Sequence, residues 1–409
     1  MSAAKFYNLH KHAESGQSIL LGQFAIAVDP AGRIEQMQFR YHADYLALAD
    51  GDHRHGSISP LLPEVDDQVY SFDSDGRSFV GFIDDLLPDD WGKKVIARRL
   101  GKRFITDLMA LDFIGRGASI GAVKITPVNN EANWGLGLRL NRVEHIIDAL
   151  FNGQLDQLSQ QEQEAALLVQ GGSQVGGARP KMLVLDDQNI PHVIKPNQRQ
   201  DAFDYAALEW ASLEICRLSG IPTAEASLYE LNGIRSLLIK RFDVTESGGR
   251  LHMVSVNSLL KDPASQMDAM QYSYEDIADC IRKYSCCPRE DLQQLFAQML
   301  INQVLSNSDD HLRNFSMMQT EQGWQLAPVY DVVPQQFYPA EHACMFNGSG
   351  YLPKLVDAEL SGKRLGLSKK DILDVKGRVE NALSHWRMLL KEKGISDEKA
   401  LRLTEITQQ

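Results

Sequence analysis

The sequence has few cysteines, no excess of positive charge and no long apolar run. An odd, scattered set of cysteines favours a reducing compartment over a disulfide framework; the five are Cys216, Cys280, Cys286, Cys287 and Cys344. The residues after Met1 lack the apolar core of a signal peptide, and no apolar run approaches the length of a membrane span. We therefore expect a cytoplasmic protein with no membrane contact.

The charge balance is acidic, with a formal net charge of −12 and a pI of about 5.4. Proteins that bind nucleic acid unaided present a basic surface, so this chain is a poor candidate for that class. Hydrophobic residues make up 44% of the sequence, which argues against global disorder. A length of 409 residues suffices for two or three domains.

Residues 300–334 are the most informative stretch. A helical pattern leads into a polar cluster, a short apolar run, a turn, and a second apolar run that ends in an acid. Kinases use an Asp that accepts the hydroxyl proton of the substrate, an Asn that holds a metal ion, and a second Asp after the next hairpin. Asp309 and Asn314 are five positions apart, as in protein kinases, and Asp331 follows 17 positions later.

The alternative interpretation of this stretch is structural, because Asp-Asp-His in a loop is often a turn or a helix cap. The strand–turn–strand pattern favours the kinase interpretation, since it places Asp331 where the second metal ligand is needed. His311 lies between the two candidate groups, where it could also face the nucleotide.

The segments 308–316 and 326–333 resemble the catalytic and metal-binding segments of the HipA-like serine/threonine kinases, the toxin halves of bacterial toxin–antitoxin pairs. The resemblance implies an α+β, two-lobed protein-kinase-like fold with an extra N-terminal subdomain and an all-helical C-terminal lobe. We expect an N-terminal subdomain over 1–140, a nucleotide-binding lobe with a Gly-rich loop and hinge over 141–244, and a helical lobe with the catalytic and metal-binding loops over 245–409.

A glycine-rich segment covers residues 171–181. Glycines let the backbone approach phosphates closely, although such a turn is also often only structural, and this one is not a Walker A motif. It resembles the phosphate loop of the HipA family, which implies ATP contacts from Gly176, Gly177, Ala178, Arg179, Pro180 and Lys181. The family serine, which is phosphorylated in self-inactivation, commonly precedes the Val directly. Here Gln174 holds that place, so Ser173 is a hypothetical autophosphorylation site.

Lys195 ends a short apolar strand, as the phosphate-binding lysine of a kinase does. Glu209 is a candidate partner for it on the following helix, and Glu214 competes. Asn232-Gly233 predicts a hairpin, and its second strand ends in a segment that resembles the adenine-binding hinge of the family. That segment is Lys240, Arg241, Phe242 and Asp243, with Lys240 in place of the usual acid.

Other segments carry structural expectations. Alternating apolar residues around the turn at 29–32 predict a hairpin. Residues 82–100 predict a helix, a proline break and a second helix, an element with a counterpart in the HipA family. Near the C-terminus we expect one helix over roughly 369–393 and a short one near 397–406.

The resemblance implies transfer of the ATP γ-phosphoryl group to a Ser or Thr hydroxyl, with Mg²⁺ as cofactor. Asp309 would be the base, Asn314 and Asp331 the metal ligands, and Lys195, His311 and Tyr330 would lie at the nucleotide. Family members act on aminoacyl-tRNA synthetases and bind a HipB-like helix-turn-helix antitoxin, so DNA would be contacted only indirectly. Two alternatives stay open: a non-catalytic co-repressor with this fold, and a small-molecule kinase.

Overall fold

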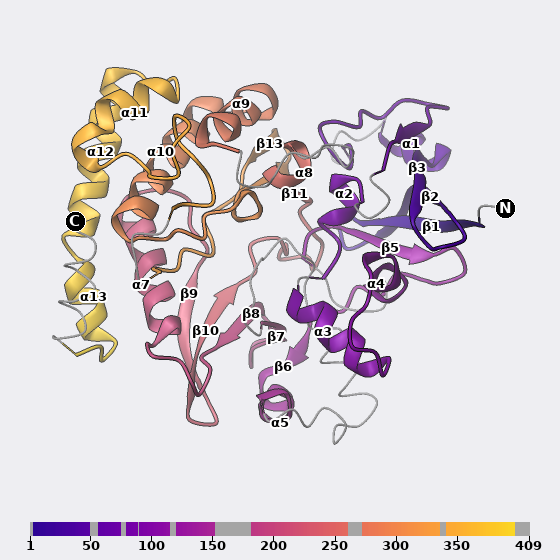
Figure 1. The fold of residues 1–409 in the computed structure, drawn as a ribbon, viewed down its shortest axis with the longest axis horizontal. Helices are drawn as coiled ribbons and strands as arrows, with labels where there is room; N and C mark the ends of the chain where they lie inside the picture. The colour runs from indigo at the N-terminus through magenta and orange to yellow at the C-terminus, as the bar shows by residue number, and fades with distance from the viewer. Residues whose placement is uncertain are drawn as a thin grey trace. The chain divides into compact units, whose positions relative to one another are not determined.

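The computed structural model describes residues 3–49, 56–74, 79–88, 90–114, 120–151, 181–260, 272–335 and 341–396 (Figure 1). The chain groups into two compact units that are interleaved along the sequence. Unit 1 comprises Met1–Val193, Arg241–Gln266 and Met318–Gly323, and unit 2 comprises Ile194–Lys240, Met267–Met317 and Trp324–Gln409. No helix in the described ranges is both long and apolar enough to cross a membrane.

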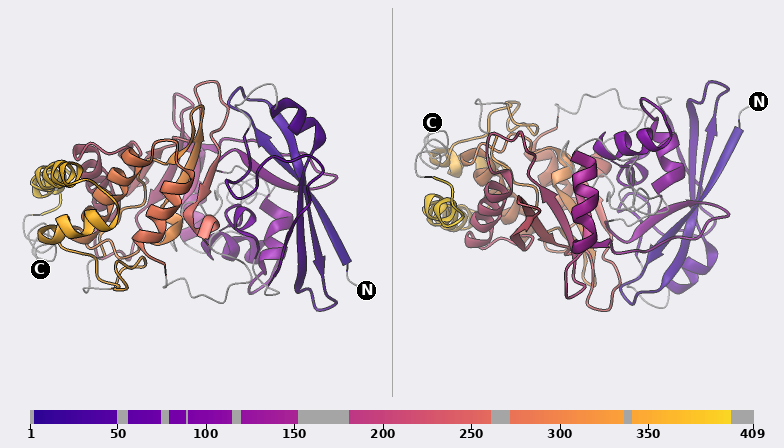
Figure 2. Two further views of the ribbon diagram at one scale, coloured as in Figure 1. Left: turned by 90° about the horizontal axis from the view of Figure 1, so that it is seen from above. Right: turned by 90° about the horizontal axis from the view of Figure 1, so that it is seen from below.

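Unit 1 contains an antiparallel sheet, whose N-terminal strands are drawn in indigo in Figure 2. The strand order is β4-β3-β2-β1-β5. The strands are β1 (Ala3–His12), β2 (Ser18–Val28), β3 (Ile34–Tyr41), β4 (Tyr70–Phe72) and β5 (Val123–Pro127). The predicted hairpin is confirmed as β2 and β3. Buried and partly exposed residues alternate along β2, as expected for a strand that covers a core with one face.

The core of unit 1 lies on that sheet and includes Leu9, Phe24, Met37 and Phe39. The helices of this unit are α1 (Ala43–Ala49), α2 (Gly81–Asp84), α3 (Asp90–Arg99), α4 (Asp107–Ile114), α5 (Leu140–Phe151) and α8 (Val256–Leu260). Its remaining strands are β6 (Leu138–Arg139), which runs parallel to β7 (Met182–Leu185), and β11 (Met253–Ser255). The predicted helix, proline break and second helix correspond to α2 and α3.

Helices α2 and α8 approach each other closely because residue 81 is glycine. A Cβ atom there would collide with the backbone of Ser258. The Ser258 hydroxyl donates a 2.7 Å hydrogen bond to the Gly81 carbonyl. Next to this contact, the buried Asp85 carboxylate accepts hydrogen bonds from the Ser255 amide at 2.8 Å and the Ser255 hydroxyl at 2.5 Å.

Unit 2 begins within strand β8 (Pro191–Pro196), whose C-terminal half adjoins β10 (Ile234–Lys240). Strand β10 pairs antiparallel with β9 (Ala226–Leu231). The turn between them is Asn232-Gly233, with φ values of 48° and 73°. Two positive φ values are typical of the type I′ hairpin turn that this dipeptide predicts.

The helices of unit 2 pack around α10, which contacts α7, α9 and α12. The elements are α7 (Tyr205–Leu218), α9 (Tyr274–Tyr284), α10 (Pro288–Val304), α11 (Ala358–Arg364), α12 (Lys369–Leu383), α13 (Trp386–Glu392), and the 3₁₀ turns η3 (Leu312–Asn314) and η4 (Leu355–Asp357). Helix α10 is buried on nearly every side, from Leu292 to Asn302, as a central helix must be.

Two expectations for the C-terminal part need correction. The single helix expected over 369–393 is two helices, because the chain leaves the helix at Ser384 and His385 and re-enters it at Trp386. The C-terminal lobe is not all-helical, because it contains β11, β12 (Ser316–Thr320) and β13 (Gly323–Leu326). Strands β12 and β13 are neighbours in one sheet and lead the chain to Asp331. The short helix expected near 397–406 lies outside the described residues.

Candidate active site

Lys195 is held between two carboxylates in unit 2. Its Nζ atom lies 2.7 Å from Glu209 Oε1 and 2.6 Å from Asp331 Oδ1. All three side chains are largely buried, with exposed fractions of 12%, 6% and 14%. Burial lowers the pKa of Lys195, but the charges of Asp331 and Glu209 outweigh burial and hold it well above the usual value. The ammonium group is therefore a fixed positive charge at physiological pH.

Helix α7 delivers Glu209 to this contact. The helix begins after Asp204, whose side chain accepts a 3.0 Å hydrogen bond from the Ala207 amide and caps the N-terminus. The choice between the two candidate partners is settled: Glu209 binds Lys195, whereas Glu214 binds Arg217. Five residues along a helix correspond to a rotation of about 140°, so these two glutamates face different sides.

Asp331 follows a short stretch of backbone that is fixed within unit 2. The Val329 amide donates to the Pro222 carbonyl, and the Ala224 amide donates to the Val329 carbonyl, both at 2.9 Å. Asp331 itself has a φ of 58°. Positive φ is uncommon for residues other than glycine and is found at functional sites, where the surrounding structure must support it. This backbone turn places the carboxylate against Lys195.

Asp309 lies in the loop after α10 and is exposed, with a side-chain exposure of 59%. The neighbouring Asp310 is fully buried. The loop is tied to its surroundings by backbone hydrogen bonds at both sides of Asp309: the Gln335 amide donates to Ser306 at 2.9 Å and the Ala343 amide donates to Ser308 at 3.0 Å. An exposed carboxylate on a fixed loop can reach the hydroxyl of an incoming substrate.

Asn314 belongs to the same loop and connects back to Asp309. Its Nδ2 atom donates a 2.7 Å hydrogen bond to the Asp309 carbonyl oxygen. Its Oδ1 atom is buried and has no hydrogen-bond partner among the described residues. A buried amide oxygen without a donor is a ligand of the kind that Mg²⁺ accepts, so the chemistry of this position fits a metal ion.

Two further residues expected at the nucleotide have distinct surroundings. The His311 ring is partly buried, and its Nε2 atom lies 4.0 Å from Asp309 Oδ1. The Tyr330 hydroxyl is buried, donates to the Arg313 carbonyl at 2.9 Å and lies 2.7 Å from the Ser316 hydroxyl. Tyr330 thus joins the loop at 309–314 to β12 through its hydroxyl group. The expected contact of these residues with ATP stays a prediction.

The residues of the expected hinge are arranged as follows. The Lys240 side chain is exposed and lies 3.2 Å from Glu225. The Arg241 guanidinium is buried and binds the Asp243 carboxylate at 2.6 and 2.9 Å. Phe242 is partly buried. Because a hinge binds adenine through backbone groups, these side-chain positions leave its assignment a prediction.

The predicted phosphate loop is not part of the described structure. Ser173, Gly176, Gly177, Ala178, Arg179 and Pro180 lie outside the described residues. Lys181 is described; it is buried and directly precedes β7 in unit 1. The phosphate contacts of this loop and the phosphorylation of Ser173 therefore stay predictions.

Several residues that support the site were not predicted from the sequence. Asp204 was detectable, because an Asp before a helical pattern is an N-cap signal. Asp310 and its buried partners gave no signal that distinguishes them from the neighbouring Asp309. Arg235 and Lys393 are 158 positions apart and are linked by a 2.8 Å hydrogen bond, which no local pattern indicates.

Two parts of the sequence match models of known protein families. A family model described as the HipA-like C-terminal domain matches residues 173–386, just over half of the chain. The chain belongs to the HipA-like family. A second model, the HipA N-terminal domain, matches residues 22–126. The range matched by the HipA-like C-terminal domain contains Lys195, Asp309, Asn314 and Asp331.

Individual HipA-like relatives are distant. The chain is 25% identical over 342 residues to "Putative kinase Y4mE" of Sinorhizobium fredii, covering 77% of this chain and 72% of the relative. It is 24% identical over 372 residues to "Toxin YjjJ" of Escherichia coli K12, covering 84% and 78%. In fold it is similar to a chain of the Shewanella oneidensis HipA, HipB and operator DNA complex. That match has a TM-score of 0.67 and 16% identity and covers 98% and 95% of the two chains. The predicted α+β, kinase-like fold is confirmed.

Proposed function

We propose that this HipA-like chain is an ATP- and Mg²⁺-dependent serine/threonine protein kinase of the cytoplasm. The observation that carries the proposal is the position of Lys195, whose Nζ atom lies within 2.7 Å of carboxylates from helix α7 and from the end of the β12–β13 segment. A lysine at the end of a strand, a helical glutamate and an aspartate after a hairpin are the groups that kinases use to place the phosphates.

In the proposed reaction, Asp309 accepts the proton of a Ser or Thr hydroxyl while the hydroxyl oxygen attacks the γ-phosphorus of ATP. The new oxygen–phosphorus bond forms as the bond to the β–γ bridging oxygen breaks, and ADP leaves with that oxygen. Asp309 suits this role because its side chain is exposed at the surface of a fixed loop. Lys195 would bind the α- and β-phosphates, and Glu209 would keep its ammonium group in place.

Asn314 and Asp331 are the residues that would hold Mg²⁺, which neutralises phosphate charge when it is bound. Within the described ranges, no group of three or more His, Cys, Asp and Glu side chains is arranged as a metal site. A mixed pair of one amide and one carboxylate agrees with that finding, because Mg²⁺ in kinases takes its remaining ligands from nucleotide phosphates and water.

We further propose that the chain acts as the toxin of a HipA–HipB-type pair. The supporting facts are the name of the E. coli relative and the composition of the S. oneidensis complex, which contains HipB and operator DNA. A HipB-like helix-turn-helix antitoxin would then bring the chain to DNA, which suits its net charge of −12. A translation component such as an aminoacyl-tRNA synthetase is the proposed substrate, and Ser173 the proposed site of self-phosphorylation.

The test is ATP-dependent phosphate transfer by the full chain. Wild type, Asp309→Asn and the control Asp357→Asn, which changes an exposed aspartate outside the catalytic loop, are incubated with γ-labelled ATP, Mg²⁺ and a host lysate. We expect labelled protein from wild type and the control and loss of label from Asp309→Asn. Intact mass before and after incubation reports phosphate on the chain, and peptide mapping places it on Ser173 or elsewhere.

The same experiment distinguishes the alternatives. Transfer of label to a small molecule rather than to protein would replace the protein kinase by a small-molecule kinase. Absence of both ATP binding and transfer, in a chain that carries no phosphate at the start, would contradict the kinase proposal and favour a non-catalytic co-repressor. ATP binding is followed by calorimetry, so that inactivity from a missing substrate is not mistaken for inability to bind nucleotide.

A further inference from the structure

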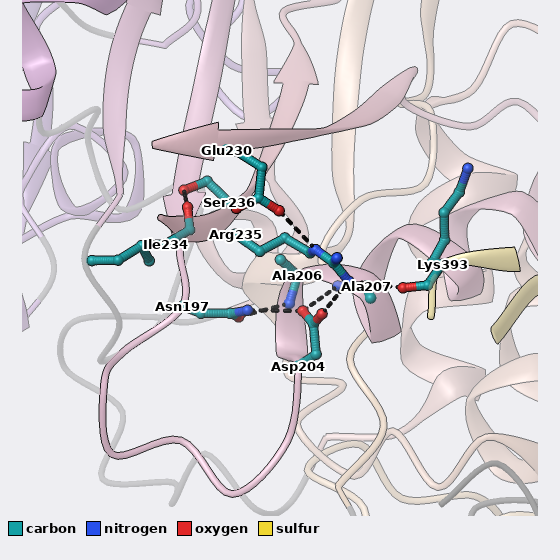
Figure 3. Close-up of polar contacts among 9 residues, drawn as sticks. All are labelled: Asn197, Asp204, Ala206, Ala207, Glu230, Ile234, Arg235, Ser236 and Lys393. Carbon is teal, nitrogen blue, oxygen red and sulfur yellow. Dashed lines mark hydrogen bonds and ion pairs between the residues drawn. The ribbon is translucent and has the colours of Figure 1, made fainter. Parts of the chain in front are cut away.

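Arg235 in strand β10 connects two helices of unit 2. Its Nη1 atom donates to Asp204 Oδ2 and to the backbone oxygen of Lys393, both at 2.8 Å (Figure 3). Its Nε atom donates to Glu230 at 3.1 Å. A guanidinium group presents several donors in a fixed plane, so one side chain can hold acceptors from different elements in a defined arrangement.

One acceptor of Arg235 lies at the N-terminus of a helix and the other at the C-terminus of a different helix. Asp204 is the N-cap of α7, and Lys393 directly follows α13. A carboxylate is favoured at a helix N-terminus and a cation at a C-terminus, where the last carbonyl groups have no partner in the helix. The charge of Arg235 therefore complements both the cap of α7 and the end of α13, and it fixes these two ends near each other.

Asn197 extends this cluster to the strand that carries Lys195. Its Nδ2 atom donates to Asp204 Oδ1 at 2.8 Å, and its Oδ1 atom accepts from the Ala206 amide at 2.9 Å (Figure 3). Its own amide donates to the Arg235 carbonyl at 3.0 Å. Asn197 comes two positions after Lys195, and Asp204 comes five positions before Glu209. The cluster thus links the chain near Lys195 to the start of the helix that carries Glu209.

The end of α13 also contacts α7 on the other side of Glu209. The Lys393 ammonium lies 4.2 Å from the centre of the Trp210 ring, a cation–π contact. Helices α7 and α13 pack against each other. The two contacts of Lys393, through Arg235 to Asp204 and directly to Trp210, flank the Glu209 position along α7.

We propose that Arg235 is a positioning residue for the Lys195–Glu209 pair, and that the end of α13 is part of the same support. Arg235 touches neither side chain of the pair. It holds the N-terminus of α7 through Asp204, so that the Glu209 carboxylate stays 2.7 Å from the Lys195 ammonium. The importance of this pair for phosphate transfer rests on the proposed kinase function, but the positioning itself can be measured without catalysis.

The measurement is the reactivity of Lys195 toward an amine-acetylating reagent, read by mass spectrometry of its peptide and normalised to the exposed Lys370. Lys195 is only 12% exposed, and the Glu209 and Asp331 carboxylates on its ammonium group shield it from the reagent. In Arg235→Gln the start of α7 loses its cation, so Glu209 is no longer held 2.7 Å from Lys195 and the amine becomes accessible. We expect acetylation at Lys195 to accelerate by roughly tenfold, as for the loss of one charge-assisted hydrogen bond.

Arg378→Gln is the matched control. Arg378 in α12 donates a 2.7 Å hydrogen bond to the Ser219 carbonyl at the other end of α7. Ser219 is ten residues from Glu209, about 15 Å along the helix axis. Loss of this contact loosens α7 without touching Asp204, so acetylation of Lys195 should match wild type. Arg235→Lys keeps the charge but not the planar donor group, and should give an intermediate rate.

The outcomes separate the possibilities. Acceleration at Lys195 in Arg235→Gln and not in Arg378→Gln supports the positioning role. Equal acceleration in both variants, or a wild-type rate in a folded Arg235→Gln, overturns it. If Arg235→Gln does not fold, the comparison of Arg235→Lys with Arg378→Gln decides in the same way. Failure of unphosphorylated wild type both to bind ATP and to transfer phosphate would contradict the kinase proposal and leave this measurement intact.

Discussion

The Tyr274 hydroxyl donates a 2.6 Å hydrogen bond to the buried carboxylate of Asp310. The same carboxylate accepts from the Ala343 amide at 2.9 Å and lies 3.1 Å from His342 Nδ1. Burial together with the charge of Asp310 raises the pKa of Tyr274 well above its usual value, so Tyr274 remains a donor. Asp310 therefore anchors the loop to the helical core, whereas the adjacent Asp309 is exposed.

Because Asp310 is buried and Asp309 is exposed, substitutions at the two positions should have opposite effects on stability and activity. Asp310→Asn should lower the free energy of unfolding by about 2–4 kcal/mol, because the buried Tyr274 hydroxyl and the Ala343 amide lose their carboxylate acceptor. Asp309→Asn should change that free energy by less than about 0.5 kcal/mol and reduce phosphate transfer by roughly 10²–10⁴-fold. Urea unfolding and the rate of label incorporation give the two numbers. A stable, fully active Asp309→Asn would remove Asp309 from the reaction.

The two glutamates of α7 provide a second matched pair. Glu209→Gln takes away one of the two carboxylates that hold Lys195, so its ammonium group loses its fixed position and phosphate transfer should fall by roughly 10²-fold. Glu214→Gln removes only a contact with the exposed Arg217 and should cost less than about 0.5 kcal/mol of stability, with transfer unchanged. Steady-state rates at saturating ATP make the comparison. Equal loss in both variants would mean that α7 as a whole, and not the Lys195 contact, is responsible.

The local structure of residues 300–334 was predictable because its pattern is local in sequence. The spacing from Asp309 to Asn314 and the hairpin before Asp331 involve residues close together in the sequence, and so does the turn at Asn232-Gly233. The structure places Lys195 against Asp331 although 136 positions separate them. The sequence did not predict that contact, because it indicated only that the two residues have roles in one mechanism.

Other features could not be predicted, for physical reasons that differ. Sequence spacing alone gives no indication of which of Asp309 and Asp310 is buried, and burial is what distinguishes them. The break between α12 and α13 was missed because buried residues continue across it, from Val379 and Ala382 to Trp386. There the Ser384 hydroxyl donates to the Asn381 carbonyl at 2.6 Å, a local bond that competes with the helix.

Asp85 predicts a pH dependence of stability in unit 1. Burial raises its pKa to about 6, although hydrogen bonds from Ser255 oppose the shift. An unfolded Asp has a pKa of about 3.9, so the folded state binds more protons between these values. The stabilising contribution of the protonated form is present below about pH 4 and is lost as the pH rises through about 6.

The corresponding variant is Asp85→Asn, which cannot titrate. Relative to this variant, wild type should lose about 2 kcal/mol of unfolding free energy between pH 4 and pH 7. Urea unfolding at intervals across that range gives the difference, and Asp357→Asn reports the effect of removing an exposed carboxyl group. A difference between wild type and Asp85→Asn that stays constant with pH would show that Asp85 does not titrate in this window.

Tyr330 was expected at the nucleotide, and the contacts of its hydroxyl group make a different prediction. That group donates to the Arg313 carbonyl at 2.9 Å and lies 2.7 Å from the Ser316 hydroxyl. Its hydrogen-bonding capacity is therefore already used by contacts within the protein. Tyr330→Phe leaves buried partners unsatisfied and should lower the free energy of unfolding by about 1–3 kcal/mol. The affinity for ATP, measured by calorimetry below the unfolding range, should stay within about twofold of wild type, since a loss of one hydrogen bond to a ligand would cost more than that. Weaker ATP binding with unchanged stability would instead place the hydroxyl group at the nucleotide.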